Sequence, residues 1–159
     1  MSSDAIGEHY CLCELLLAEK EAYLANGLTQ KGWDIAVLDG EKTIRVQVKC
    51  INWNSSGQAA VKGTFISQEF DYLVLILLHF NNQKFTSFVI PYEKLKEKAE
   101  NDRTTLIDES GYVYYSARTK KKNDKGFEKQ AIAISTLKKP EIQESFKLYE
   151  NNFNAIKAA

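Results

Sequence analysis

The chain has no long apolar segment and no excess of charge of either sign. Its longest apolar run covers residues 72–78, whereas a membrane-spanning helix needs about 20 apolar residues, so a transmembrane protein is excluded. Lysine plus arginine and aspartate plus glutamate number 21 each, which makes the net charge zero. The generally basic surface that attracts a phosphate backbone is therefore missing, although a local basic patch is not excluded.

Cysteine is scarce, and the three cysteines, Cys11, Cys13 and Cys50, are an odd number. No signal-peptide pattern accompanies them, so they are typical of buried thiols in a reducing compartment, and we expect a soluble cytoplasmic protein. Internal repeats and low-complexity linkers are also lacking. The 159 residues therefore fit a single domain, 1–159, which can bury a core without disulfides or a structural metal.

Hydrophobic periodicity predicts the secondary structure. The expected elements are a helix over 4–20 with Asp4 as its N-cap, a strand over 22–25, a hairpin of strands 33–38 and 43–50, a loop over 52–62, strands over 71–80 and 85–90, a helix over 92–100, weaker strands over 111–115 and 130–135, and a helix from near Pro140 whose apolar face includes Tyr149, Phe153 and Ile156. The 71–80 run is almost continuously apolar, which is typical of a strand covered on both faces. This order predicts an α/β fold with a central mixed β-sheet flanked by helices.

The strand over 43–50 carries an unusual row of polar side chains. Side chains alternate between the two faces of a strand, so the apolar residues at 44, 46, 48 and 50 point one way. Arg45, Gln47 and Lys49 point the other way. Three long polar side chains on a strand that is otherwise central indicate either a solvated sheet face or a functional site.

The hairpin register decides what lies beside this row. If Gly40 and Glu41 form the tip of the turn, Asp34 lies directly opposite Gln47, and facing residues share one side of the sheet. A shift of one residue would remove this convergence. With this register, a carboxylate, an amide and the ammonium group of Lys49 meet in one small patch.

Such a patch suits metal-assisted hydrolysis of a phosphodiester. The Asp34 carboxylate can hold Mg²⁺ (or Mn²⁺), and Mg²⁺ takes only one or two protein carboxylates and keeps several waters. The Gln47 side-chain oxygen and the backbone carbonyl of Val48 can complete the protein ligands. Lys49, a point charge with mobile donors, can orient the attacking water or stabilise charge on the phosphate.

The segments 32–37 and 44–49 together resemble the PD-(D/E)XK nucleases, which carry an acidic residue at the start of one strand and a (D/E)-x-K tripeptide on the next. The sequence is most similar to the branch that includes Holliday-junction resolvases and small homing-type endonucleases with glutamine in the tripeptide. Ile6-Gly7-Glu8, at the start of an apolar helix, is also similar to that branch. The resemblance covers about residues 5–95, and 104–159 would form a C-terminal part of the same domain.

The resemblance implies a restriction-endonuclease-like fold and a Mg²⁺-dependent endonuclease that cuts DNA as a homodimer or higher homo-oligomer, since cutting both strands takes two sites. It assigns the metal to Asp34, Gln47, Val48 and Glu8, and the transition state to Lys49. Trp33 stands where the family has proline, a common variation. Gln47 contributes no charge, so Glu8 would have to compensate for the missing carboxylate.

Other interpretations remain open. One alternative is a catalytically inactive nuclease-fold module that binds nucleic acid or a protein partner, and another is an enzyme that selects branched DNA by its shape. The residues expected to contact nucleic acid are Lys31, Arg45, Trp53, Lys62, Lys120, Lys121 and Lys122. The basic stretch 118–125 is equally typical of a surface loop. His9, Cys11 and Cys13 are two residues apart on a helix and therefore cannot converge on one zinc ion.

Overall fold

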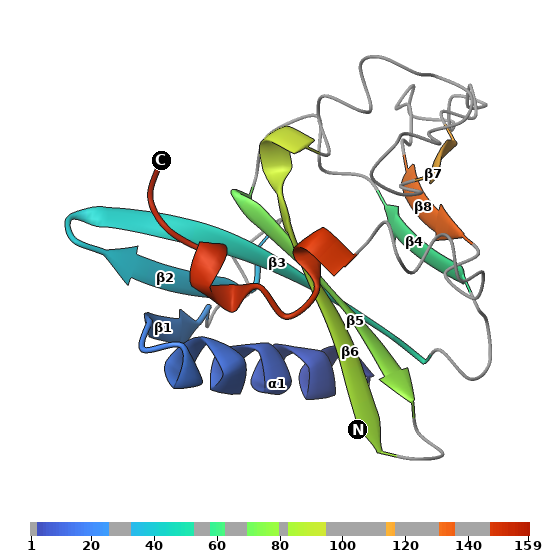
Figure 1. The fold of residues 1–159 in the computed structure, drawn as a ribbon, viewed down its shortest axis with the longest axis horizontal. Coiled ribbons are helices and arrows are strands. Elements are labelled where there is room, and N and C mark those ends of the chain that lie inside the picture. Colours follow the sequence, from blue (N-terminus) through green and yellow to red (C-terminus); the bar gives the residue numbers. More distant parts are fainter. Residues whose placement is uncertain are drawn as a thin grey trace.

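A computed structural model describes most of the predicted core and the C-terminal segment of the chain. The described residues are 3–25, 33–52, 58–62, 70–79, 83–94, 114–116, 131–135 and 147–159. Their elements, shown in Figure 1, are α1 (Ser3–Leu17), β1 (Glu21–Leu24), β2 (Ile35–Asp39), β3 (Lys42–Asn52), β4 (Gln58–Lys62), β5 (Tyr72–His79), β6 (Lys84–Pro91), β7 (Tyr114–Ser116), β8 (Ala131–Ser135) and the 3-10 helices η2 (Lys147–Tyr149) and η3 (Phe153–Ala155). Within this part of the chain no helix is long and apolar enough to cross a membrane.

The main element is a five-stranded sheet in the order β1-β2-β3-β5-β6. The β3–β5 pair is parallel, and the β1–β2, β2–β3 and β5–β6 pairs are antiparallel. β5 lies between β3 and β6, and residues 73–78 of β5 are all buried, as the continuous apolar run predicted. The α/β class with a central mixed sheet is therefore confirmed.

α1 packs against one face of this sheet (Figure 1). Val46, Val48 and Cys50 of β3 are buried on that face, together with Cys11 and Leu15 of α1, in one hydrophobic core. The burial follows the predicted alternation along β3, which leaves the polar row on the opposite face. Asp4 lies inside the first turn of α1, which begins at Ser3, so its assignment as the N-cap was wrong.

The β2–β3 hairpin has the predicted turn and register. Gly40 has a φ of 62°, and this positive value at the first turn position is typical of a type II′ turn, which glycine accepts without steric cost. Asp39 pairs with Lys42 at the tip, and Ile35 pairs with Val46 at the far end of the ladder. The short turn thus fixes the register on which the site depends.

The loop predicted over 52–62 was wrong in its second half. β3 continues to Asn52, and β4 pairs with β8, which also pairs with β7, in a separate three-stranded sheet (Figure 1). The apolar alternation in β4 is short, and its partner strand β8 is about 70 residues away in the sequence. No local sequence pattern therefore predicted this pairing. The predicted strands at 111–115 and 130–135 correspond to β7 and β8.

The helix predicted from near Pro140 is wrong for the described residues 147–159. Two 3-10 helices replace it, separated by Asn151, whose φ is 51°. The Asn151 N–H donates to the Ser87 carbonyl at 3.0 Å, and the buried Ser87 hydroxyl donates to Asn151 Oδ1 at 2.6 Å. Pairing with β6 thus overrides the helical periodicity, although Phe153 and Ile156 are buried as predicted. Residues 140–146 of that helix and 95–100 of the helix predicted at 92–100 lie outside the described residues.

Candidate active site

Asp34 immediately precedes β2, where the regular pairing of β2 with β3 ends. Its N–H donates to the Val46 carbonyl at 2.8 Å, although Ile35 is the ladder partner of Val46. Two consecutive residues therefore face one residue of the neighbouring strand, which is the arrangement of a β-bulge. Asp34 Oδ2 accepts the Val48 N–H at 2.7 Å. The bulge thus turns the carboxylate toward β3, just beyond the end of the ladder.

Gln47 lies next to this carboxylate, as the register predicted. Its Nε2 donates to Asp34 Oδ2 at 3.3 Å, so the amide oxygen points elsewhere. That oxygen, Oε1, is buried and has no hydrogen-bond partner among the described residues. Buried polar atoms nearly always have a partner, because burying one without compensation is costly. Gln47 Oε1 is therefore an acceptor that a donor or a cation could satisfy.

The electrostatics of Asp34 show which charges surround it. Burial raises the pKa of the Asp34 carboxyl above its ordinary value, the Val48 N–H and the positive charge of Lys49 act in the opposite direction, and Asp4 raises it further. Lys49 is therefore the positive charge that acts on this carboxylate, and it lies two positions after Gln47 on the same face of β3.

The negative charge of Asp34 acts on a second carboxylate, that of Glu8 on α1. Burial is the largest cause that raises the pKa of Glu8, followed by the negative charges of Asp34 and Asp4, while His9 lowers it. Mutual repulsion between carboxylates favours protonation of one of them, and a cation placed between them would remove that repulsion. The structure therefore brings the Asp34 carboxylate and the Gln47 amide into contact, while the charge of Lys49 acts on Asp34 and the charge of Asp34 acts on Glu8.

Asp4 is a further negative charge that acts on Glu8 and Asp34, and the sequence reasoning missed it. It was interpreted as a helix cap, yet its charge raises the pKa of Glu8, Asp34 and Cys50. Asp4 and Glu8 are four residues apart on α1, a spacing that places both on one helical face. This spacing, together with the predicted helix, was the signal that could have identified it.

The donor set suits a hard cation such as Mg²⁺. In an extended strand the N–H and C=O of one residue point to the same side, so the Val48 carbonyl lies on the side of Asp34. Carboxylate, amide and carbonyl oxygens are the ligands that Mg²⁺ takes, with water in the remaining positions. Among the residues that the structure describes, no three His, Cys, Asp or Glu side chains are grouped to hold a metal. Asp34 and Gln47 therefore supply oxygen donors of the kind that Mg²⁺ takes, and water would have to complete its ligands.

Arg45, predicted to contact nucleic acid, has a partner within the protein. Its Nε and Nη2 donate to the Asp71 carboxylate at 3.2 and 3.1 Å, and its backbone N–H donates to Asp71 Oδ2 at 2.7 Å. Arg45 and Asp71 are each about one-third exposed, with side-chain exposures of 35% and 32%. The pair joins β3 to the start of β5.

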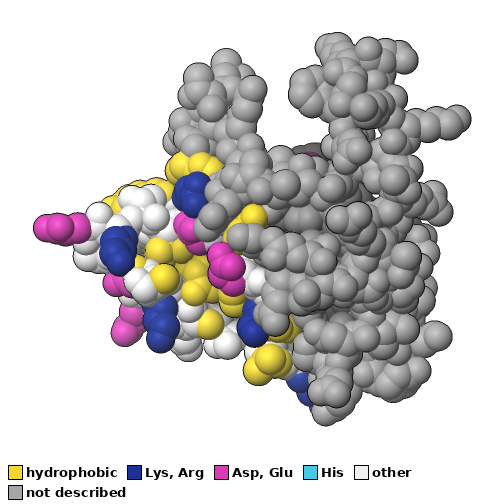
Figure 2. All heavy atoms as spheres, turned by 90° about the horizontal axis from the view of Figure 1, so that it is seen from above, with side chains coloured by type: hydrophobic (Ala, Val, Ile, Leu, Met, Phe, Trp, Pro, Cys, Tyr) yellow, Lys and Arg dark blue, Asp and Glu magenta, His cyan; other side chains and the backbone are white. Residues whose placement is uncertain are grey.

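The remaining predicted nucleic-acid contacts have no described side chains. Lys31, Trp53, Lys120, Lys121 and Lys122 lie outside the described residues, and Lys62 is described only as the last residue of β4. Figure 2 shows lysine and arginine side chains interspersed with acidic ones over the described part of one face.

The cysteines are not candidates for chemistry. Cys11 and Cys50 are buried and free, as predicted, whereas the free Cys13 is exposed and contradicts the expectation of a buried thiol. Burial raises the pKa of the Cys11 thiol well above its ordinary range and that of Cys50 to about 11. Both thiols therefore stay protonated and unreactive at neutral pH.

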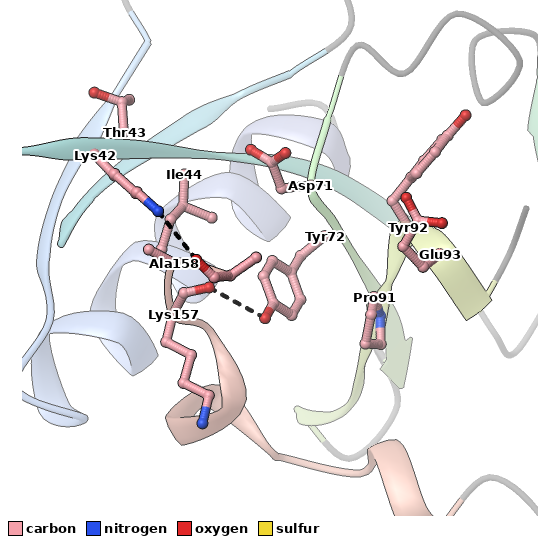
Figure 3. Close-up of a pocket in the computed structure, with 11 residues that line it drawn as sticks. Lys42, Thr43, Ile44, Asp71, Tyr72, Pro91, Tyr92, Glu93, Lys157 and Ala158 are labelled. Carbon is pink, nitrogen blue, oxygen red and sulfur yellow. Dashed lines mark hydrogen bonds between the residues drawn. The ribbon is translucent and has the colours of Figure 1, made fainter.

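A pocket of about 310 Å³ lies apart from Asp34 and Gln47. It lies between the start of β3, the β5 and β6 strands and the C-terminal segment (Figure 3). Lys42 Nζ donates to the Ala159 carbonyl at 3.0 Å, and the Tyr72 hydroxyl donates to the Ala155 carbonyl at 2.9 Å. These two polar groups hold the C-terminal segment in place. Asp34 and Gln47 do not line the pocket, so it plays no part in the candidate site.

Comparison with known proteins gives a distant likeness. No protein-family model matches the chain, and no curated protein matches it. One similar solved structure is that of a bacterial homing endonuclease. This protein, I-Ssp6803I, is 15% identical over 58% of this chain and 68% of its own, with a TM-score of 0.44.

Proposed function

We propose that this protein is a metal-dependent endonuclease that hydrolyses DNA phosphodiester bonds at Asp34, Gln47 and Lys49, with Glu8 as an additional carboxylate. One observation carries the proposal: a half-buried carboxylate, Asp34, lies beside Gln47, whose own buried side-chain oxygen has no partner among the described residues, and the charge of Lys49 acts on that carboxylate. Burying such groups without a ligand costs stability, which is typical of functional sites.

Each residue has a distinct task in this proposal. Asp34 and Glu8 would hold a divalent cation together with Gln47 Oε1 and the Val48 carbonyl. A bound Mg²⁺ or Mn²⁺ would acidify the attacking water and offset charge on the phosphate. The Val48 N–H keeps the Asp34 carboxylate oriented. Lys49 would orient the water or donate to a phosphate oxygen as negative charge develops there.

DNA is the proposed substrate and partner because Asp34 and Lys49 stand at positions of the nuclease motif that the sequence resembles, with Gln47 at the position of the motif's second carboxylate. A homodimer is the proposed active form, since cutting both strands takes two sites. Within the class, plasmid and branched DNA are the two substrates to compare, because shape selection would favour the second.

The test is cleavage of plasmid and branched DNA with Mg²⁺ or Mn²⁺. We expect Asp34→Asn and Lys49→Ala each to lower the rate by at least about 100-fold. Asn keeps an oxygen for the Val48 N–H, so the loss would report charge rather than misfolding. Glu41→Gln, in the exposed hairpin turn, and Lys84→Ala, at the exposed start of β6, are the matched controls. Cleavage that survives both site substitutions would refute the assignment.

A second candidate function is a non-catalytic nuclease-fold module that binds nucleic acid or protein. The observation that favours it is Gln47, which supplies no charge where the nuclease motif has a carboxylate. Isothermal titration with Mn²⁺ separates the two functions. Binding that Asp34→Asn abolishes supports the nuclease, whereas absence of binding together with metal-independent DNA binding supports the module.

A further inference from the structure

Gly7 lies in the middle of α1, where alanine would be the better helix former. A Cβ atom built at Gly7 would lie 2.4 Å from Cys50 Cβ and 3.2 Å from Cys50 Sγ. Real Cβ atoms do not approach each other so closely. The helix therefore lies against β3 at a separation that only glycine permits.

This contact adjoins two residues of the candidate site. Glu8 follows Gly7 on α1, and Lys49 precedes Cys50 on β3. A helix and a central strand are both stiff, so the point where they touch determines how far Glu8 lies from the strand that carries Gln47 and Lys49. We infer that the contact between Gly7 and Cys50 sets the position of Glu8 relative to β3, which makes Gly7 a positioning residue for the proposed metal site; its role for the metal rests on the proposed function.

A side chain at position 7 would have to displace the helix. The first atom that it meets is Cys50 Cβ, which is fixed to the β3 backbone and cannot rotate away. β3 is held between β2 and β5, whereas α1 contacts the sheet from one side only. The helix would therefore move outward and carry Glu8 away from β3.

The test measures repulsion between Glu8 and Asp34 without metal or DNA. Asp4 also repels Glu8 from the same helix, so every protein compared carries Asp4→Asn. In that protein Glu8→Gln removes the charge that Asp34 repels, and we expect it to raise the Tm by about 2 °C or more. In the Gly7→Ala background this gain should fall to less than half, because the two carboxylates are farther apart. In the Gly40→Ala background, destabilised at the hairpin tip, the gain should persist in full. An equal gain in all three backgrounds, or no gain in the protein that carries Asp4→Asn alone, would overturn the inference.

A rescue variant keeps the test decisive if Gly7→Ala does not fold. Adding Cys50→Gly to Gly7→Ala removes the atom that the new Cβ would meet, so folding and the full gain from Glu8→Gln should return. Failure of that rescue would contradict the contact as the cause. A separate Mn²⁺ titration should show affinity about 10-fold weaker in Gly7→Ala and unchanged in Gly40→Ala. If Mn²⁺ does not bind the unchanged protein, the proposed function fails, while the Tm comparison still decides the role of Gly7.

Discussion

Replacing Gln47 by glutamate tests both the register and the metal site. Gln47→Glu is nearly isosteric, so packing is preserved, but it removes the amide donor that lies 3.3 Å from Asp34 Oδ2 and puts a second negative charge there. We expect the metal-free protein to be destabilised at neutral pH and metal to restore much of the loss. The same substitution would supply the carboxylate that the nuclease motif usually carries.

The magnitude follows from the geometry. At 3.3 Å and an effective dielectric constant of about 20, two unit charges repel each other by about 5 kcal/mol. The destabilisation cannot exceed the cost of protonating one of the two carboxyls, because a protonated carboxyl is no longer repelled. Protonating a carboxyl of ordinary pKa, about 4.3, at about pH 7 costs about 4 kcal/mol. The unfolding free energy should therefore fall by about 2–4 kcal/mol, which corresponds to a Tm lower by about 4–16 °C.

The assay is urea denaturation across pH, with and without Mn²⁺. The repelled carboxyl has a raised pKa in the folded protein, so the loss should shrink as pH falls through that value. Mn²⁺ at about 100 times its dissociation constant should restore about 2.7 kcal/mol. Thr43→Glu, exposed on the same face of β3, is the control and should change stability by less than about 0.5 kcal/mol. The predicted repulsion between the new carboxylate at position 47 and Asp34 would be refuted if the Gln47→Glu protein were as stable as the unchanged one. It would also be refuted if the stability of Gln47→Glu depended on neither pH nor Mn²⁺.

Three further predictions follow from the same contacts. The raised pKa of Asp34 means that its ionised form destabilises the metal-free fold. The unfolding free energy of Asp34→Asn, relative to the unchanged protein, should therefore rise as pH rises through that pKa and level off above it. Urea titrations that show no such trend would contradict this prediction. Because a cation binds the ionised carboxylates, Mn²⁺ affinity measured by calorimetry should weaken as pH falls through the raised pKa values of Asp34 and Glu8, and a pH-independent affinity would argue against carboxylate ligands. Asp71→Ala removes three hydrogen bonds from Arg45, one of them from its backbone, and should cost about 2–4 kcal/mol in denaturant unfolding; a cost below about 1 kcal/mol would show that the pair contributes little.

Local signals in the sequence determined the hairpin and the polar row. Alternation along β3 placed Gln47 and Lys49 on one face, because the period of a strand is two whatever surrounds it. Gly40 determined the turn, since few other residues accept its positive φ, and the turn determined the register. The continuous apolar run of β5 indicated a buried strand. Local pattern and turn chemistry were therefore sufficient to place Asp34 beside Gln47.

Tertiary structure alone decided the rest. The bulge at Asp34 turns its carboxylate toward the Val48 N–H, and a bulge adds a residue that periodicity cannot foresee. The charge of Asp4 acts on Asp34, and Arg45 bonds to Asp71, because each interaction links segments that only folding brings together. The C-terminal segment shows the same limit: its apolar spacing is helical, yet pairing with β6 is stronger than that local preference. Sequence determines which face a side chain occupies, whereas contacts between distant segments decide which neighbours it meets there.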